Sequence, residues 1–492
     1  MMGIYLIRFV PRLAHFRIPE LLSVAASLGV DEQSLDLRPA VAECSTELVE
    51  CEGPEDPEWR EDTYGTYGPS LLQFARFESD ALAVEVARRC VLVRHLARVI
   101  GAGQMYELCL ADALERWRTE PWLKAIADDP HMSWRCRMDA MGCAYANEQK
   151  VEKYHVFGEI LKGIKGKVDL KRPKMQLYVF EGRSPLKLKL MHRDRSPRRK
   201  LKSSSSSLDD ALGHELQVAA SGGHDESAAS FDEIEGDSDD DASDGSRGAV
   251  SQPPQPDVVV FGVYLSRGFH DAARIFDVSK RCLMSTTSME GSMAVIMANM
   301  SSMRRQNEVV CDPFCGSASL LLSAAYLGAQ VLGFDIDDTS LSGRSINDKR
   351  NRLGELPFPC PLGNAVCTIT KNFEQLGLRE GPLDLAVMDC GSALRDGMLD
   401  VVLTDPPYGL REGAFEQTDN QLVAAKDIIL SLLEFSARQL RPGGRLVYFL
   451  PVLRHEYCDE NVPSHPALKL LFNAEQPLSI NFSRRLMVLE RL

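Results

Sequence analysis

The stretch Val401-Val402-Leu403-Thr404-Asp405-Pro406-Pro407-Tyr408-Gly409 decides the fold assignment. Its apolar run predicts a buried parallel strand, which the prolines end because proline cannot donate to a β-ladder. The loop that follows is expected to hold a carboxylate and an aromatic ring side by side. In an open parallel sheet, ligands bind in such loops at the carboxyl ends of the strands.

The order Asp405-Pro406-Pro407-Tyr408 fits catalysis at an exocyclic amine of a nucleobase. Such an amine is a weak nucleophile because its lone pair is delocalised into the ring. The Asp405 carboxylate and the Pro406 carbonyl can accept its two N–H groups and favour a more tetrahedral nitrogen. The prolines fix the backbone, and the ring of Tyr408 offers a face on which the base stacks. Read alone, the same residues also fit a proline-rich turn after any strand.

Two more strand ends precede this loop. Residues 308–312 predict a strand, residues 313–319 a turn that contains glycine, and residues 320–326 an apolar helix, which is the first unit of a nucleotide-binding α/β fold. Residues 330–334 predict the second strand, and Asp335 follows where an acid binds ribose hydroxyls in such folds. Cofactor contacts are expected from the turn and from this acid, namely Asp312, Pro313, Phe314, Gly316, Ser317 and Asp335.

The remaining units follow in order. Residues 383–389 predict a third strand, and Asp389 at its end is a candidate contact to the adenine edge of a cofactor. Beyond the Asp405 loop we expect a long helix near 421–440, a turn at 441–444 and a strand at 445–450. Upstream, residues 285–299 predict a helix with Ser288 as its cap.

Size and composition indicate a multidomain globular protein. A chain of 492 residues is too long for one core, and 44% hydrophobic with 26% charged residues is ordinary for such proteins. No apolar run approaches the roughly 20 residues that a membrane helix needs. Thirteen cysteines include no CxxC pair, which predicts a reduced, cytoplasmic protein without a metal site of its own.

The net charge of −14 is concentrated in one segment. Residues 203–256 carry 13 Asp or Glu and one Arg, so the remainder of the chain has a net charge of only −2. Residues 183–202 are basic, and a serine run and an acidic run follow. Residues 183–256 therefore predict a disordered linker, because so few apolar residues cannot offset the entropy of ordering.

The first 182 residues predict an α+β region. We expect strands at 3–10, 71–77, 134–141 and 176–181, and helices at 18–28 and 151–164. Residues 79–97 have helical spacing that runs into the β-rich residues 90–93. The segment Lys162–Lys174 is rich in basic residues beside glycines, a pattern that fits contact with a phosphate backbone, although a solvated loop fits it equally well. The candidate RNA-binding residues in it are Lys165, Lys167, Lys171 and Arg172.

Several motifs together resemble one family. DPFCGSASLLLSAAYLGAQVLGFDID, TDPPYGLRE, TSMEGSMAVIMAN, GGRLVYFLPVLRHEY, SRRLMVLERL and KGKVDLKRPKMQLYVFE are similar to the catalytic subunit of the eukaryotic tRNA guanosine N2-methyltransferase acting at position 10. The resemblance covers almost the whole chain apart from residues 183–256. Ala318 departs from the family, which usually has a second glycine there. If this position has a positive φ or lies close to the cofactor, an alanine there would weaken cofactor binding. If it opens the helix, the alanine is harmless, and this second alternative is the one we expect.

The resemblance implies an architecture and an activity. The architecture is a ferredoxin-like domain at 1–80, a THUMP-like RNA-binding domain at 81–182 and a Rossmann-like methyltransferase domain at 257–492. The activity is transfer of a methyl group from S-adenosylmethionine to N2 of a guanosine in tRNA, with a small zinc-binding activator subunit as partner. From the residues alone, a DNA or rRNA amino-methyltransferase and a non-catalytic tRNA-binding protein remain open.

Overall fold

The computed structural model describes two mixed sheets within one compact unit, residues 1–185 and 256–492. The described residues are 2–40, 70–141, 143, 145–183, 255–283, 288–304, 307–338, 341, 368–378, 381–391, 394–407, 419–479 and 481–492. The predicted disordered linker at 183–256 therefore lies almost wholly outside the described residues. No helix in the described part of the chain is long and apolar enough to cross a membrane.

The first sheet contains seven strands in the order β2-β3-β1-β4-β7-β6-β5. Their bounds are β1 Gly3–Phe9, β2 Arg38–Pro39, β3 Leu72–Phe77, β4 Val93–Gly103, β5 Trp134–Ala140, β6 Met175–Gly182 and β7 Val258–Ser266. Neighbouring strands are antiparallel, except that β5 and β6 run parallel. The four strands predicted in this half of the chain are confirmed within one or two residues at each end.

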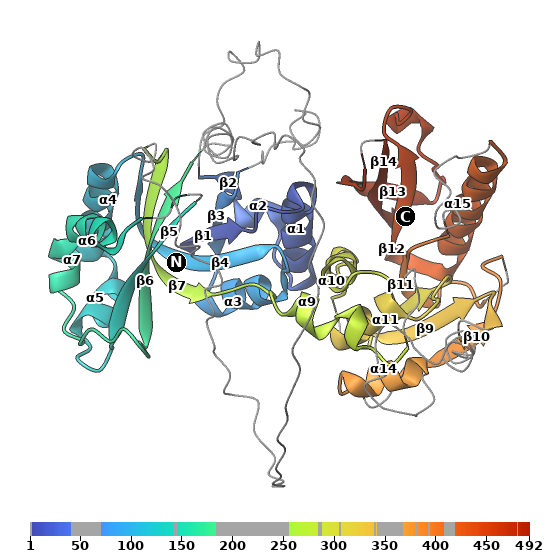
Figure 1. Ribbon diagram of the computed structural model, residues 1–492, viewed down its shortest axis with the longest axis horizontal. Helices are drawn as coiled ribbons and strands as arrows, with labels where there is room; N and C mark the ends of the chain where they lie inside the picture. Colours follow the sequence, from blue (N-terminus) through green and yellow to red (C-terminus); the bar gives the residue numbers. More distant parts are fainter. Residues whose placement is uncertain are drawn as a thin grey trace, which may run out of the picture. The chain divides into compact units, whose positions relative to one another are not determined.

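The helices of this half are η1 Ala14–Phe16, α1 Arg17–Ser27, α2 Glu32–Leu35, α3 Asp80–Arg89, α4 Tyr106–Thr119, α5 Pro121–Asp128, α6 Asn147–Val156 and α7 Gly158–Lys162. Helices α4 to α7 lie on one side of β5, β6 and β7 (Figure 1) and bury an apolar cluster there that includes Phe157 and Phe261. Within residues 79–97, helix α3 ends at Arg89, and the β-rich residues 90–93 lead into β4. The predicted helix at 151–164 is two helices, which meet at Phe157.

Strand β7 enters this sheet from beyond the predicted linker. It pairs with β4 on one side and with β6 on the other. One continuous sheet thus combines strands from residues 1–80, from residues 81–182 and from the first residues after 256. The ferredoxin-like and THUMP-like assignments stay predictions.

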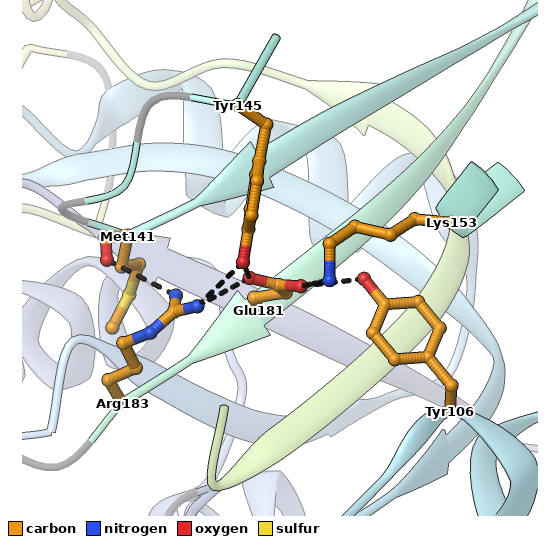
Figure 2. Close-up of polar contacts among 6 residues, drawn as sticks. All are labelled: Tyr106, Met141, Tyr145, Lys153, Glu181 and Arg183. Carbon is orange, nitrogen blue, oxygen red and sulfur yellow. Dashed lines mark hydrogen bonds and ion pairs between the residues drawn. The ribbon is translucent and has the colours of Figure 1, made fainter. Parts of the chain in front are cut away.

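A buried carboxylate organises the end of β6. Figure 2 shows Tyr106, Tyr145, Lys153 and Arg183 converging on Glu181, which is fully buried. The Tyr106 hydroxyl and the Lys153 Nζ both donate to Oε1 at 2.7 Å. The Tyr145 hydroxyl and Arg183 Nη2 donate to Oε2 at 2.8 and 2.6 Å. Both carboxylate oxygens are therefore saturated, and the contacts connect α4, α6 and β6.

The second sheet has seven strands in the order β10-β9-β8-β11-β12-β14-β13. Their bounds are β8 Val309–Asp312, β9 Gln330–Asp335, β10 Asp384–Val387, β11 Leu399–Thr404, β12 Leu440–Leu453, β13 Leu468–Pro477 and β14 Phe482–Arg491. The first five in this order are parallel, and β14 is antiparallel to both of its neighbours. The strand order reverses between β8 and β11, which is the ligand-binding position of a doubly wound sheet. The predicted Rossmann-like fold is confirmed.

The helices of this half are α9 Ala272–Ile275, η6 Val278–Lys280, α10 Gly291–Met300, α11 Ser319–Tyr326, α14 Ile369–Gln375, α15 Asp419–Gln439 and η7 Asp459–Asn461. Ser288 is not the cap of α10, because the Glu290 carboxylate accepts the N–H groups of Ser292 and Met293. The predicted turn at 441–444 lies inside β12. In the pairing of β11 with β12, Leu399 pairs with Leu440 and Val401 already pairs with Arg445. Residues 441–444 therefore form an irregularity within β12.

Candidate active site at the switch point

The site begins where β8 and β11 lie side by side. Val401 and Val402 of β11 pair with Val310 and Cys311 of β8, so Asp312 and Thr404 end neighbouring strands. Asp312 Oδ1 accepts the Thr404 hydroxyl at 2.6 Å and the Phe314 N–H at 3.0 Å. This bridge fixes the residue that precedes Asp405.

Asp312 is almost completely buried, and its ionisation is coupled to the other acids of the site. Burial, with a smaller contribution from the charges of Asp335 and Asp405, raises the pKa of Asp312 to about 7 against the lowering effect of its two hydrogen bonds. The acids predicted at the ends of β9 and β11 therefore lie close enough to Asp312 for their charges to act on it.

The glycine turn after β8 is open on its outer side. Gly316 has a φ of +48°, and no atom lies within 4 Å of a Cβ built on it. Its N–H donates to Asp335 Oδ2 at 2.8 Å, while Asp335 Oδ1 accepts the Asp337 N–H at 2.9 Å. The turn thus presents open backbone beside a fixed carboxylate.

Ala318 has both properties that the sequence analysis treated as alternatives. It is the N-cap residue of α11, as expected, and it also has a left-handed backbone with φ 59° and ψ 32°. A left-handed residue other than glycine costs about 1–2 kcal/mol. The interpretation of this alanine as harmless is therefore wrong for the backbone.

A series of polar contacts between side chains supports the glycine turn. Ser317 Oγ lies 2.8 Å from Ser288 Oγ and 3.3 Å from Ser319 Oγ. Arg281 Nη1 donates to Ser319 Oγ at 2.6 Å, and burial lowers the pKa of this guanidinium to about 10. The sequence around Arg281 has no motif, so its place in the site could not be predicted. A cavity of about 410 Å³ adjoins these side chains at Ser288. It is lined by Ala273, Asp277, Val278, Ser279, Ser288, Glu290 and Gly291.

Asp405 and Pro406 lie directly after β11. Pro406 is buried and Asp405 partly buried, whereas Pro407 is exposed and Tyr408 lies outside the described residues. Asp405 Oδ2 forms an ion pair with Arg484 Nη1 of β14 at 3.6 Å. Arg484 is 79 residues from Asp405 in the chain, so its place in the site could not be predicted from local sequence either.

The remaining cofactor candidates are placed around the same edge. Asp389 lies two residues beyond β10, whose last residue Val387 pairs with Asp335 of β9. Its carboxylate is exposed and accepts the Gly391 N–H at 2.7 Å. Pro313 is buried and Phe314 partly buried. In the described part of the chain, no group of three His, Cys, Asp or Glu residues could hold a metal ion.

The basic segment Lys162–Lys174 is an exposed loop between α7 and β6. Lys165, Lys167, Lys171 and Arg172 are exposed, and Lys165 Nζ forms an ion pair with Asp128 at 2.8 Å. The glycine at 166 has a packing role, because a Cβ there would lie 1.9 Å from the Met132 carbonyl oxygen. Phosphate approach is therefore not needed to explain this glycine.

The strand order, the open glycine turn and the acids at three strand ends define the class of a Rossmann-like methyltransferase domain. The sequence agrees, since residues 279–454 match the family described as "RMKL-like, methyltransferase domain". This match confirms the predicted Rossmann-like methyltransferase domain over this part of the chain.

Curated relatives give a more particular likeness. The chain is 35% identical over 260 residues to tRNA (guanine(10)-N(2))-methyltransferase TRMT11 of Gallus gallus, covering 49% of this chain and 54% of the relative. The protein of that name from Homo sapiens is 35% identical over 263 residues, covering 49% and 55%. The tRNA (guanine(10)-N(2))-methyltransferase of Schizosaccharomyces pombe is 32% identical over 240 residues, covering 48% and 50%. The chain thus spans about half the length of the curated relatives it matches.

A solved structure gives a weak overall likeness. TrmN from Thermus thermophilus superposes with a TM-score of 0.38 at 16% identity, covering 99% of this chain and 100% of that one.

Proposed function

We propose that the chain transfers a methyl group from S-adenosylmethionine to the exocyclic N2 of a guanosine in tRNA, at position 10. The observation that carries the proposal is the position of Asp405, which follows a buried parallel strand at the switch point and lies within electrostatic reach of Asp312. The names of the curated relatives supply the substrate and the position.

The residues around the glycine turn fit S-adenosylmethionine. The open side of Gly316 leaves room for a ligand against the backbone, and Asp335 beside it is an acceptor suited to ribose hydroxyls. Phe314, Ser317 and Asp389 would complete the contacts, Asp389 at the adenine edge. When bound, S-adenosylmethionine supplies an activated methyl group.

Asp405 and Pro406 then act on the target amine. The Asp405 carboxylate and the Pro406 carbonyl accept its N–H groups, which orients the nitrogen lone pair for in-line attack. As the nitrogen forms its new bond to carbon it becomes positively charged, and the carboxylate stabilises that charge. The proton leaves the nitrogen after transfer, when it is acidic. The ring of Tyr408 is the proposed stacking face for the base, which is flipped out or splayed from the tRNA.

Asp405→Ala tests the assignment of the carboxylate. The variant is expected to lose methyl transfer to tRNA by at least about 10³-fold, since both the orientation and the charge stabilisation disappear. Binding of S-adenosylmethionine by calorimetry and of tRNA by filter retention should change less than threefold. Asp384→Ala, at an exposed acid that begins β10, is the matched control and should keep full activity. Near-normal transfer by Asp405→Ala would defeat the assignment.

The loop Lys162–Lys174 is the proposed contact to the tRNA backbone. Reversing the charges of Lys165 and Lys167 to Glu is expected to weaken tRNA binding and to flatten its salt dependence, because fewer counterions are released. The Lys165–Asp128 pair is exposed, so its loss should cost little stability. Lys469→Glu, an exposed change on β13, is the control. An unchanged salt slope in the double variant would show a solvated loop instead.

A small zinc-binding activator and a cytoplasmic location complete the proposal. The edge strand β10 carries exposed apolar side chains at its two ends, Leu383 just before it at 55% exposure and its last residue Val387 at 57%, which suits a protein partner. Co-purification with the activator, and mass spectrometry of treated tRNA with and without it, test this part. Parallel assays on rRNA and on duplex DNA distinguish the tRNA enzyme from its alternatives.

A further inference from the structure

The guanidinium of Arg484 is held in place by contacts with several neighbouring elements. Its Cζ lies 3.9 Å from the ring centroid of Phe449, which is buried in β12. Its Nε donates to Gln476 Oε1 of β13 at 2.7 Å, and its Nη2 lies 3.5 Å from Met289 Sδ. The remaining terminal nitrogen, Nη1, is the one that faces Asp405 Oδ2 at 3.6 Å. The plane of the guanidinium is therefore set by neighbouring elements, and one edge of it is directed at Asp405.

Asp405 needs such a partner for a geometric reason. The prolines at 406 and 407 fix their own φ angles, but they do not set the side-chain torsions of Asp405. An acceptor that must present one oxygen to an amine loses rate when its direction varies. A clamped guanidinium that attracts Oδ2 restricts these torsions, and Arg484 lies 13% exposed where such an ion pair is only partly screened.

We propose that Arg484 is a positioning residue for methyl transfer, which holds Oδ2 of Asp405 and so orients the carboxylate toward the target amine. Arg484 acts through Asp405 and need not touch the substrate. This inference rests on the proposed function, because it takes the target amine as the ligand of Asp405.

The neighbouring Arg485 provides a matched control. It lies on the opposite face of β14, since successive residues of a strand alternate. Its Cζ stacks 3.9 Å from the Tyr457 ring centroid, and its Nε donates to Asn473 Oδ1 of β13 at 2.6 Å. Arg485 therefore makes the same kinds of structural contact as Arg484, without the ion pair to Asp405.

The experiment measures kcat and KM for tRNA, and S-adenosylmethionine affinity by calorimetry, in the full-length chain and in Arg484→Ala, Arg484→Lys and Arg485→Ala. Arg484→Ala is expected to lower kcat by about 10²-fold, as for a catalytic group displaced by about 1 Å, with KM and cofactor affinity within threefold. Arg484→Lys keeps the charge without the planar fork and should lose about tenfold. Arg485→Ala should keep its kcat. Guanidinium at millimolar concentration should restore part of the kcat of Arg484→Ala, and urea, which is neutral and of similar shape, should not.

The results separate the two proposals. If the unmodified chain transfers no methyl group to tRNA, the proposed function fails and the role of Arg484 fails with it. If the unmodified chain is active and Asp405→Ala is not, but Arg484→Ala equals Arg485→Ala, only the positioning role is overturned. A loss in Arg484→Ala confined to KM or to cofactor affinity, or equal rescue by urea, also overturns it. If Arg484→Ala does not fold, Arg484→Lys decides, and an undiminished kcat in that variant overturns the proposal.

Discussion

Replacing Glu181 by Gln is expected to destabilise the N-terminal half of the protein strongly. The carboxylate is fully buried, and its four donors include Lys153 and the fully buried Arg183 (Figure 2). A glutamine side chain has one acceptor oxygen, so its NH2 group must face one of the two cations or a hydroxyl that reorients. Removing one partner of a buried ion pair costs about 3–5 kcal/mol, because the remaining charge loses its compensation.

The assay is chemical and thermal denaturation of the full chain. The expected loss corresponds to a fall in Tm of roughly 6–20 °C for the transition of this half, at about 2–4 °C per kcal/mol. Glu159→Gln is the matched control, since its ion pair with Arg118 is exposed at both ends and is separated by 3.8 Å. Exposed pairs contribute at most about 1 kcal/mol.

The pH dependence gives a second readout. Burial alone would raise the pKa of Glu181, but the hydrogen bonds from Lys153, Tyr106, Arg183 and Tyr145 together outweigh burial and leave this pKa below its ordinary value of 4.5. A lowered folded-state pKa means that the stabilisation is present above pH 4.5 and is lost as the pH falls further, through the folded-state value. The difference between wild type and Glu181→Gln should therefore shrink in acid. A destabilisation no larger than that of Glu159→Gln, or one independent of pH, would refute the reasoning.

Two further predictions concern single side chains. Asp312→Asn keeps an acceptor for Thr404 and Phe314 and removes a carboxyl whose pKa is raised to about 7. The stability that this carboxyl contributes in its protonated form is complete below pH 3.8, its ordinary pKa, and is lost as the pH rises through 7. The variant should exceed wild type in free energy of unfolding by about 1–4 kcal/mol at pH 8 and by nearly nothing at pH 4 in urea titrations; an equal difference at both pH values would contradict this. Gly166→Ala should lower the free energy of unfolding by at least about 1–3 kcal/mol, because its Cβ would overlap the Met132 carbonyl oxygen. Its control, Gly158→Ala in α7, meets no atom within 4 Å and should raise stability by up to about 1 kcal/mol, so similar effects in both variants would show that packing at 166 is not the cause.

The parts of the fold that sequence could predict are those set by local patterns. Strand β8, the glycine turn and α11 follow one another within 18 residues, so periodicity and turn chemistry suffice to place Asp312 and Gly316. The acids at the ends of β9 and β11 follow from the same logic, because parallel strands end at a common edge. Local patterns also have a limit, as at 441–444, where a turn sequence predicted that the strand begins at residue 445, whereas β12 already begins at Leu440 and includes these residues.

Contacts between distant segments could not be predicted in this way. Arg484 meets Asp405 because β14 inserts antiparallel between β12 and β13, and nothing in the sequence near Arg484 indicates that insertion. The same holds for Glu181, of whose donors Tyr106, Tyr145 and Lys153 lie 75, 36 and 28 residues away in the chain, and for β7, which pairs across the predicted linker. In each case the decisive partner is fixed by topology, and topology is a property of the whole sheet.

The three acids of the site differ in what holds them, and that difference carries chemical meaning. Asp312 is bound by a hydroxyl and a backbone N–H, and Asp335 accepts two backbone N–H groups. For Asp312, the hydrogen bonds from neutral donors do not fully offset the effect of burial on the pKa, which stays raised. Asp405 instead has a guanidinium beside it, and a nearby cation favours the charged form of a carboxylate. Under the proposed function the target amine gains positive charge during the reaction and needs a charged acceptor. Of the three acids, Asp405 is the one that has an arginine beside it.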